Sequence, residues 1–378
     1  MRVLIAPDSF KECLSAQAVA GAIAEGWRRA APQDVLVEMP LADGGEGTTV
    51  ALVKAAAGTL HACTVTGPLG TPVTAHFGLI DAGGTAVVEV AEGSGLHLVA
   101  PEQRDALLAS SSGTGELILA ALQSRPRRMI IGLGGSATTD AGVGLLQALG
   151  AGFTDAQGLP LEPGGGALIN LAHIDIAPVL ERLFGIEIIV ATDVTNDLLG
   201  PRGAAAVYSP QKGASAEQVA ALERGMQHYA ACARAHGLVV DGFPGSGAAG
   251  GIGGSLAGLL RARIVSGVEM VMNTVGLEQQ LREADIVITG EGSLDAQSAA
   301  GKVPAGVCAL AKQHGVPVVA LAGVVGASLQ ALHEHGLTAA FSIAPGPLTL
   351  PDSLANAAQH LARTAEQIAR LVHGVRFP

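Results

Sequence analysis

Polar side chains follow several apolar runs of this 378-residue chain, at the points where predicted strands end. At the first of them, Asp8, Ser9 and Lys11 come directly after the apolar run of residues 3–6. Because ligands in open α/β sheets bind outside the carboxyl ends of the strands, these side chains are placed to contact a ligand. Capping of the following helix is an equally good interpretation of Asp8 or Ser9.

Three of the five lysines in the chain lie in turn-like segments rather than on regular helix faces. They are Lys11, Lys212 in a Gln-Lys-Gly turn, and Lys302 in Gly-Lys-Val-Pro. A site of phosphoryl transfer needs fixed positive charge against phosphate oxygens, and loop lysines supply it. The lysines therefore favour a phosphate-handling site.

A second segment, residues 42–48, reads Ala-Asp-Gly-Gly-Glu-Gly-Thr and also follows a predicted strand. Its glycines let backbone amides approach a ligand, and Asp43 and Glu46 offer carboxylates to a hydroxyl group or to hydrated magnesium. The alternative is a structural one, in which the two carboxylates cap and charge the first turn of a helix.

A third segment, residues 131–140, follows a strand and is expected to open a helix over residues 137–149. Its glycine amides, a serine hydroxyl and the helix N-terminus predict a cradle for an anion. Read literally, Gly132, Gly134 and Ala137 also match a dinucleotide fingerprint, which keeps an NAD(P)-dependent oxidoreductase open as an alternative. That fingerprint normally closes the first βα unit of a domain, whereas this one lies well inside the chain.

Two more strand ends carry carboxylates. Asp193 follows the predicted strand 187–190, and Glu291 and Asp295 follow the strand 285–289. A carboxylate emerging at such a point is a candidate general base or metal ligand. A turn that merely ends the strand is the competing explanation for Asp193.

Composition and charge limit the classes of protein. Lys plus Arg number 22 against 33 Asp plus Glu, a net charge of −11, which argues against nucleic-acid or anionic-membrane partners. The four cysteines show no CxxC pairing, and the apolar N-terminal run is broken at Pro7 and Asp8. No apolar stretch has the length of a membrane span. We therefore expect a cytoplasmic protein without a zinc site or a disulfide framework.

The order of the predicted elements indicates two α/β domains. Length predicts about two domains at ~150 residues each. A βαβ opening over residues 3–39 is followed by short strands at 64–66, 73–80 and 85–90 that suggest antiparallel pairing, and later by helix and strand in alternation. Because the opening is too small for a sheet, we expect it to join the parallel strands of the last hundred residues. The predicted domains are a discontinuous, Rossmann-like parallel-sheet domain of residues 1–65 plus 285–378 and an inserted mixed-sheet domain of residues 66–284.

Taken together, the motifs resemble those of the type I glycerate kinase family, in the family's order and over nearly the whole chain. The resemblance rests on residues 7–11, 40–48, 113–118, 134–138, 193–196, 210–213, 247–251 and 288–292. One departure is Ser293, where the family usually has arginine in an Arg-Leu-Asp-Ser-Gln stretch.

The resemblance implies ATP-dependent, Mg²⁺-assisted phosphorylation of D-glycerate at its 2-hydroxyl, in a cleft between the two domains. A glycerate 3-kinase, a kinase of a related hydroxy acid and a non-catalytic sensor remain alternatives, and a monomer or small homo-oligomer is expected. The residues expected at the site are Lys11, Asp43 and Asp193 for catalysis; Asp8, Ser9, Glu46, Lys212 and Glu291 for substrate; Gly134, Gly135, Ser136, Thr138 and Lys302 for nucleotide; and Asp193 and Asp295 for metal.

Overall fold

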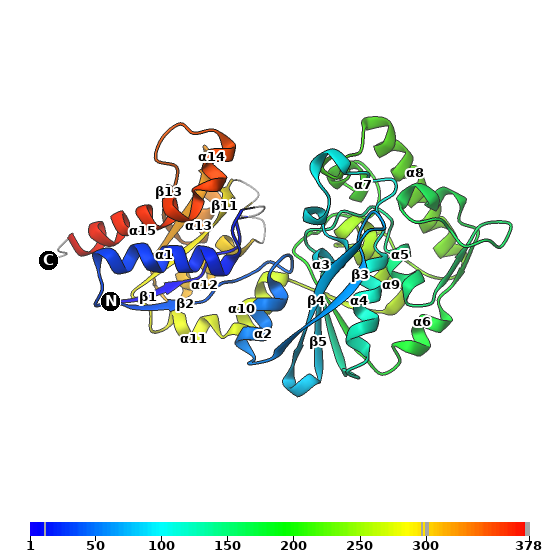
Figure 1. Ribbon diagram of the computed structural model, residues 1–378, viewed down its shortest axis with the longest axis horizontal. Coiled ribbons are helices and arrows are strands. Elements are labelled where there is room, and N and C mark those ends of the chain that lie inside the picture. Colours follow the sequence, from blue (N-terminus) through cyan, green and yellow to red (C-terminus); the bar gives the residue numbers. More distant parts are fainter. Residues whose placement is uncertain (11–12, 296–297, 299–301, 375–378) are drawn as a thin grey trace. The chain divides into compact units, whose positions relative to one another are not determined.

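The chain folds into two compact units (Figure 1). The structure is a computed structural model that describes residues 1–10, 13–295, 298 and 302–374. Unit 1 is discontinuous and comprises Met1–Asp43 and Val268–Pro378, and unit 2 is the continuous segment Gly44–Gly267. Along the chain, the two segments of unit 1 flank the continuous segment of unit 2, which is the order expected from the sequence.

The boundaries of the units differ from the expected ones by about twenty residues on each side. Strand β3 (Thr59–Thr66) pairs along its whole length with β4 (Pro72–Ile80), so residues 44–65 fall in unit 2. Helix α10 (Gly267–Val275) packs on α12 (Val303–Gln313), where a methyl group at Gly306 would lie 2.6 Å from Val268. Residues 268–284 therefore fall in unit 1.

Unit 1 is built on a five-stranded sheet in the order β13-β12-β11-β1-β2, in which every pair is parallel. Strand β1 lies between β2 and β11, so the N-terminal βαβ unit joins the C-terminal strands as predicted. Near-continuous apolar runs form these strands because both faces of the sheet are covered by helices. The strands are β1 (Arg2–Ile5), β2 (Val35–Glu38), β11 (Ile286–Leu294), β12 (Val318–Val325) and β13 (Leu337–Ser342).

Helices cover both faces of this sheet. One face packs against α1 and α15, which lie side by side (Figure 1) and approach so closely that a methyl group at Gly26 would be 1.9 Å from the Ala362 oxygen. The alternate side chains of β11 and β12 face α12 on the other side. Besides α10 and α12, the helices of unit 1 are α1 (Ala16–Ala30), α11 (Leu277–Leu281), α13 (Gln330–His335), α14 (Leu350–Ala355) and α15 (Ala357–Gly374).

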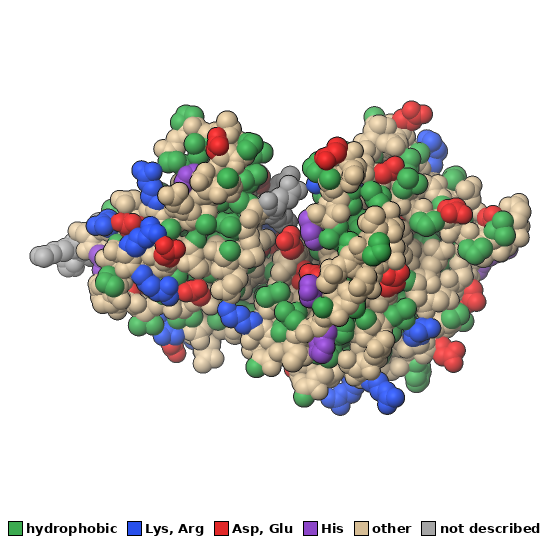
Figure 2. Space-filling model, viewed as in Figure 1, with side chains coloured by type: hydrophobic (Ala, Val, Ile, Leu, Met, Phe, Trp, Pro, Cys, Tyr) green, Lys and Arg blue, Asp and Glu red, His purple; other side chains and the backbone are tan. Residues whose placement is uncertain are grey.

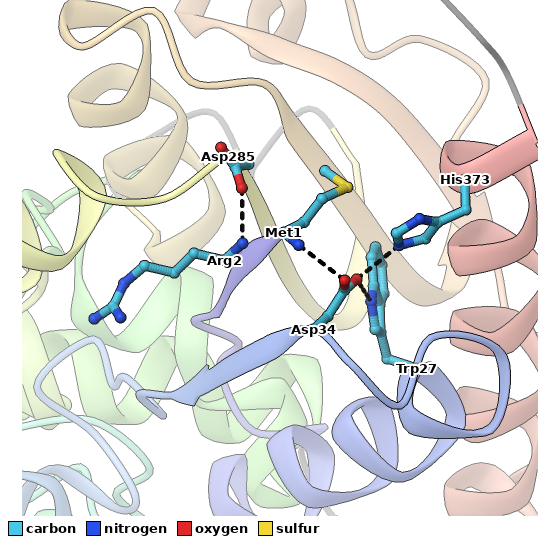
Figure 3. A network of polar contacts seen from close by, with 6 residues as sticks. All are labelled: Met1, Arg2, Trp27, Asp34, Asp285 and His373. Atoms are coloured by element: carbon cyan, nitrogen blue, oxygen red, sulfur yellow. Dashed lines mark hydrogen bonds and ion pairs between the residues drawn. The ribbon is translucent and has the colours of Figure 1, made fainter.

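A buried carboxylate ties α1 and α15 to the start of the sheet (Figure 3). The side chain of Asp34 is fully buried and accepts hydrogen bonds from the amino group of Met1 at 2.9 Å, Trp27 Nε1 at 2.9 Å and His373 Nε2 at 2.7 Å. Burial alone opposes ionisation, but these donors outweigh it and lower the pKa of Asp34. Asp34 is therefore a charged anchor inside unit 1.

Unit 2 contains a six-stranded mixed sheet in the order β10-β9-β6-β5-β4-β3. Its β10, β9, β6 and β5 strands are parallel, and β3, β4 and β5 pair antiparallel, as the Gly-rich turns between them predict. A small antiparallel pair, β7 with β8, lies apart from this sheet. The bounds not yet given are β5 (Thr85–Glu89), β6 (Arg128–Gly132), β7 (Gly152–Thr154), β8 (His173–Asp175), β9 (Glu187–Ala191) and β10 (Arg263–Val265).

The helices of unit 2 differ from the expected ones mainly after β6. The helix expected from Ala137 begins only at Val143, because Ala141 and Gly142 have φ values of 52° and 75° that no α-helix accommodates. The helices are α2 (Thr48–Ala55), α3 (Val90–Ser94), α4 (Ser112–Leu122), α5 (Val143–Ala148), α6 (Ala177–Arg182), α7 (Ala204–Tyr208), α8 (Ala216–Ala235) and α9 (Ile252–Leu260). Short 3₁₀ helices span Asp81–Gly83, Leu96–Leu98, Pro101–Gln103, Gly165–Asn170, Pro210–Lys212 and Ala248–Gly251.

Charges of both signs are interspersed on the exposed sides of α1 and α15 in unit 1 (Figure 2). Pairs such as Arg28 with Glu38 at 3.0 Å and Arg370 with Glu366 at 2.8 Å hold these side chains in place. Among the described residues, no helix is long and apolar enough to cross a membrane.

Candidate active site

In unit 1, the polar segment that follows β1 lies beside the middle of β11. Strand β11 extends to Leu294, so Glu291, which the sequence places after the strand, lies within it. Asp8 and Ser9 are both buried, and the Asp8 amide donates to the Gly290 carbonyl at 2.9 Å. Oδ1 of Asp8 accepts from the Ser9 amide at 2.6 Å. Gly290 is required here because a methyl group would lie 2.1 Å from the Leu321 oxygen of β12. The close packing of the strands therefore fixes the Asp8–Ser9 backbone.

Glu291, the residue after Gly290, is buried and forms an ion pair with Lys302. Oε2 of Glu291 lies 3.3 Å from Nζ of Lys302, which sits at the N-cap of α12 and is about one-third exposed. The sequence assigned these two residues to different ligands, whereas the structure pairs them. A ligand phosphate or carboxylate that meets Lys302 must therefore compete with Glu291.

The other predicted residues of unit 1 are partly described. Asp295 follows β11, where its amide donates to Ser298 Oγ at 3.0 Å, and it lines a cavity of about 240 Å³ beside α13. Asp43 follows β2 at the last position of unit 1 and is half-buried. Lys11 lies outside the described residues.

In unit 2, the glycine-rich loop after β6 packs directly against the loop of residues 44–47. The Gly134 amide donates to the Gly44 oxygen at 3.2 Å. A methyl group at Gly132 would lie 2.5 Å from that oxygen, and one at Gly134 would lie 2.4 Å from Gly45 Cα. These glycines therefore permit contact between two main-chain segments, and the Gly134 amide is used within the protein rather than held open for a phosphate.

Lys212 holds the glycine-rich loop through two hydrogen bonds. Its side chain is almost fully buried and donates to Ser136 Oγ at 3.0 Å and to the Thr138 oxygen at 2.6 Å. Burial lowers the pKa of Lys212 to about 7, and the charge of Asp140 opposes that shift. The residue predicted to bind substrate thus contacts the predicted nucleotide-binding loop.

Two orphaned hydroxyl groups lie on the same loop. Thr138 Oγ1 and Thr139 Oγ1 are buried without a hydrogen-bond partner among the described residues. Because an unpaired buried hydroxyl is costly, these groups fit a site completed by a ligand or by water. Together with the exposed Gly135 and with Ser136, they suit the oxygens of a polyphosphate.

Asp140, which the sequence argument did not assign, organises the far end of this loop. Its carboxylate is buried and accepts from the Ser111 amide and hydroxyl, both at 2.8 Å, and from the amides of Gly142 at 3.1 Å and Gly144 at 3.3 Å. Burial raises the pKa of Asp140 and the four hydrogen bonds oppose that shift. The carboxylate therefore joins the start of α4 to the start of α5.

Asp193 emerges after β9, as predicted, and its partner comes from the neighbouring strand. Oδ1 of Asp193 accepts from Ser266 Oγ at 2.7 Å, and Ser266 directly follows β10. The hydrogen bond orients the carboxylate, which stays half-buried. Ser266 was missed by sequence reasoning because a single serine between a strand and a helix carries no distinctive pattern.

The geometry after β6 does not suit a dinucleotide fingerprint. That motif places a pyrophosphate at the N-terminus of a helix that begins within the glycine-rich turn. Here α5 begins at Val143, eight residues after Gly135, and is one and a half turns long. The cradle predicted from the helix N-terminus is therefore wrong, and the loop itself carries the polar groups.

The predicted site residues divide between the two units. Unit 1 contains Asp8, Ser9, Asp43, Glu291, Asp295 and Lys302, and unit 2 contains Glu46, Gly134, Gly135, Ser136, Thr138, Asp193 and Lys212. Within unit 1 the structure brings the segment after β1 beside Gly290 of β11, and within unit 2 it joins Lys212 to the glycine-rich loop. The predicted metal ligands Asp193 and Asp295 belong to different units.

Comparison with known proteins identifies the family to which the chain belongs. A family model described as the glycerate kinase family matches residues 3–373. The chain belongs to the glycerate kinase family. It is 46% identical over 370 residues to a glycerate kinase of Bacillus subtilis (strain 168), with 98% of this chain and 97% of that protein covered. A glycerate 2-kinase of Escherichia coli (strain K12) is 45% identical, with the same shares covered.

A solved structure agrees with this membership of the glycerate kinase family. A crystal structure assigned to glycerate kinase 2 from Salmonella typhimurium LT2 superposes with a TM-score of 0.80 at 45% sequence identity. The match covers 99% of this chain and 98% of that one. The predicted family and the mixed α/β fold with one parallel and one mixed sheet are therefore confirmed.

Proposed function

We propose that this protein transfers the γ-phosphoryl group of ATP to the 2-hydroxyl of D-glycerate, giving 2-phospho-D-glycerate and ADP. The observation that carries the proposal is 45% identity over 98% of the chain to a glycerate 2-kinase. The strand-end carboxylates and lysines are the groups that such a transfer uses. We also propose that the protein acts in the cytoplasm as a monomer or small homo-oligomer.

The donor set suits a magnesium ion that is held mainly by the nucleotide. Among the described residues there is no group of three or more His, Cys, Asp or Glu side chains that could hold a metal. Mg²⁺ in kinases usually keeps several waters and binds one or two carboxylates together with substrate phosphates. Asp193 and Asp43, both half-buried, are carboxylates of the type that such an ion binds. Bound there, Mg²⁺ supplies positive charge that stabilises the transferring phosphoryl group.

The protein's own residues position the reactants and move a proton. Asp43 or Asp193 accepts the proton of the attacking hydroxyl, and the other carboxylate binds the metal together with Glu46 or Asp295. Lys11 offsets negative charge on the substrate. Ser136, Thr138 and Gly135 hold the ATP phosphates, and Lys212 keeps that loop in place through its two hydrogen bonds.

The carboxylates give the mechanism a direct test. Replacing Asp43 or Asp193 by asparagine keeps the shape of the side chain and removes the base or ligand charge, so each variant should lower kcat by about 10²-fold or more. Asp241→Asn is the matched control, because Asp241 pairs with exposed Arg234 at 3.0 Å and has no place in the mechanism. A near-normal kcat in either site variant would remove that residue from the mechanism.

Phosphorus NMR tests the reaction itself. Protein, ATP, Mg²⁺ and D-glycerate are incubated together, and 2- and 3-phosphoglycerate are resolved in one spectrum. Formation of the 2-isomer supports the proposal. The 3-isomer would keep the kinase and overturn the assigned hydroxyl, and a folded sample that forms neither would overturn the substrate.

A further inference from the structure

Glu89 is a buried carboxylate that the mechanism above does not use. It is the last residue of β5, and its side chain is almost fully buried. In the parallel register Glu89 lies opposite Gly132 of β6, which in turn lies opposite Ala191 of β9. Glu89 therefore sits in the row of strand ends from which the glycine-rich loop and the Asp193 segment emerge.

The carboxylate of Glu89 holds the start of helix α2. Oε2 accepts from the Gly47 amide at 3.0 Å, and Oε1 accepts from the Thr49 amide at 2.5 Å. Gly47 is the N-cap of α2 and, having no side chain, cannot itself satisfy an amide of the first turn. Glu89, on strand β5 and forty residues from Thr49 in sequence, therefore caps the N-terminus of α2.

The segment fixed in this way is the loop of residues 44–47, which carries Glu46 and directly follows Asp43. At its other end the loop is held by the hydrogen bond from the Gly134 amide to the Gly44 oxygen. Gly44 and Gly47 have φ values of 87° and 92°, so the loop adopts a shape that other residues would resist. Two attachments, one at each end, therefore set the position of Glu46.

Both attachments at Glu89 depend on its charge. An ionised carboxylate has two acceptor oxygens, whereas a protonated carboxyl or a glutamine amide turns a donor toward one of the two amides. Burial raises the pKa of Glu89 to about 7, and Glu92 on α3 adds to the shift while the amides of Thr49 and Gly47 oppose it. The capped and uncapped states are thus both accessible near neutral pH.

The charged groups on the elements around β5 are few. Glu92 is held by the amide of His76 on β4 at 2.7 Å and by its Nδ1 at 3.0 Å. Glu116 on α4 accepts from the Thr66 amide at 2.6 Å. The other charged groups on the described residues of these elements and the loop are Lys54 in the last turn of α2, Glu46 on the loop, and, at the opposite end of β5 and β6, Asp81 and Arg128.

We propose that Glu89 is a positioning residue for the transfer reaction: its ionised carboxylate holds the loop of residues 44–47 in its active arrangement, and protonation releases that loop. The inference rests on the proposed function, because it explains how Glu46 and the chain beyond Asp43 are set for catalysis. Glu89 acts through the main chain and is not itself the base.

Glu89→Gln tests this role, with Glu92→Gln as the matched control on the next element. In the wild type, kcat should decline as pH falls through about 7. E89Q should have a kcat about 10- to 100-fold lower at pH 8 and should lack this decline. E92Q should keep that decline, moved to slightly lower pH. E89D should keep a titrating carboxyl and recover part of the activity.

Amide exchange provides a readout that does not need turnover. In the wild type, the protection factors of the Gly47 and Thr49 amides, which are corrected for intrinsic exchange, should be about tenfold lower at pH 6 than at pH 8. In E89Q the two amides should have low protection factors at both pH values. This result would support the loop attachment even if glycerate were not the substrate. Unchanged exchange in E89Q, or an E89Q enzyme with wild-type kcat and the same pH profile, would overturn the inference.

Discussion

Replacing Asp34 by asparagine should destabilise unit 1 by several kcal/mol. The fully buried carboxylate receives Trp27 and His373 on the same oxygen, Oδ2, and the Met1 amino group on Oδ1. An asparagine amide keeps one acceptor oxygen and turns its NH₂ group toward the other donors. Hydrogen bonds to charged groups contribute about 1.5–3 kcal/mol each, and breaking a buried pair costs about 3–5 kcal/mol. We therefore expect a loss of about 4 kcal/mol, or roughly 10 °C in Tm.

The chain provides its own probe for this experiment. Trp27 is the single tryptophan, and its Nε1 donates to Asp34, so urea and thermal unfolding followed by tryptophan fluorescence report on unit 1. Asp241→Asn is the surface control, for which the change should stay below about 1 kcal/mol. His373→Leu should show an intermediate loss because it removes one of the three donors to Asp34.

The dependence on pH follows from the direction of the Asp34 pKa shift. Because the folded protein lowers the pKa of Asp34, the carboxylate contributes its full stability above the unfolded value of about 3.9, and that contribution is lost as pH falls through the lower, folded pKa. The difference between wild type and D34N should thus be constant from pH 7 to 5 and shrink below about pH 4. A D34N protein within 1 kcal/mol of wild type at pH 7 would refute this reasoning, as would a difference that does not change down to pH 3.

Two further substitutions test the glycine-rich loop. Lys212→Met keeps most of the length of the buried side chain and removes both hydrogen bonds to the loop, so the KM for ATP should rise at least about tenfold. Because burial lowers the pKa of Lys212 to about 7, unfolding stability should rise with pH between about 7 and 10 in the wild type and lose this rise in K212M, as urea titrations can measure. Gly134→Ala places a methyl group 2.4 Å from Gly45 Cα, so kcat/KM should fall about 10²-fold and stability by about 1–3 kcal/mol, measured by steady-state kinetics and urea unfolding. Gly21→Ala in α1, where nothing lies within 4 Å, is the control and should raise stability by up to about 1 kcal/mol. An unchanged KM in K212M, or equal behaviour of the two alanine variants, would contradict these expectations.

The sequence predicted the elements that have strong local patterns. Strands β1, β4, β5 and β9 begin and end within one residue of the expected ranges 3–6, 73–80, 85–90 and 187–190, because an apolar run is a local signal. The sequence predicts that β1 pairs with a C-terminal strand because the N-terminal βαβ unit is too small to form a sheet by itself. The helix start after β6 was missed because positive φ at Ala141 depends on packing, and alanine gives no local sign of it.

The site was predictable where chemistry follows a strand end and hidden where it depends on tertiary contacts. Asp8 and Asp193 could be found because each follows an apolar strand within three residues. Glu291 could be found from its Gly-Glu-Gly context, although β11 continues through it to Leu294. Glu89 closes an apolar strand, and its contacts with the Gly47 and Thr49 amides are set by tertiary structure. The pairing of Lys302 with Glu291 likewise depends on where α12 begins, which residue spacing does not determine.

The order of strands in unit 1 has a consequence for how the chain is made. Val3 of β1 pairs with Ile286 of β11, whereas unit 2 is one uninterrupted segment. At about 5–20 residues per second, the ribosome delivers β11 roughly 15–60 s after β1. During that time β1 can pair with β2 while its other edge waits, and unit 2 has its whole sequence available to fold. The parallel sheet can therefore be completed around β1 only when the polypeptide is nearly complete. A chain that ends before β11 keeps an apolar strand, β1, with one edge that has no pairing partner.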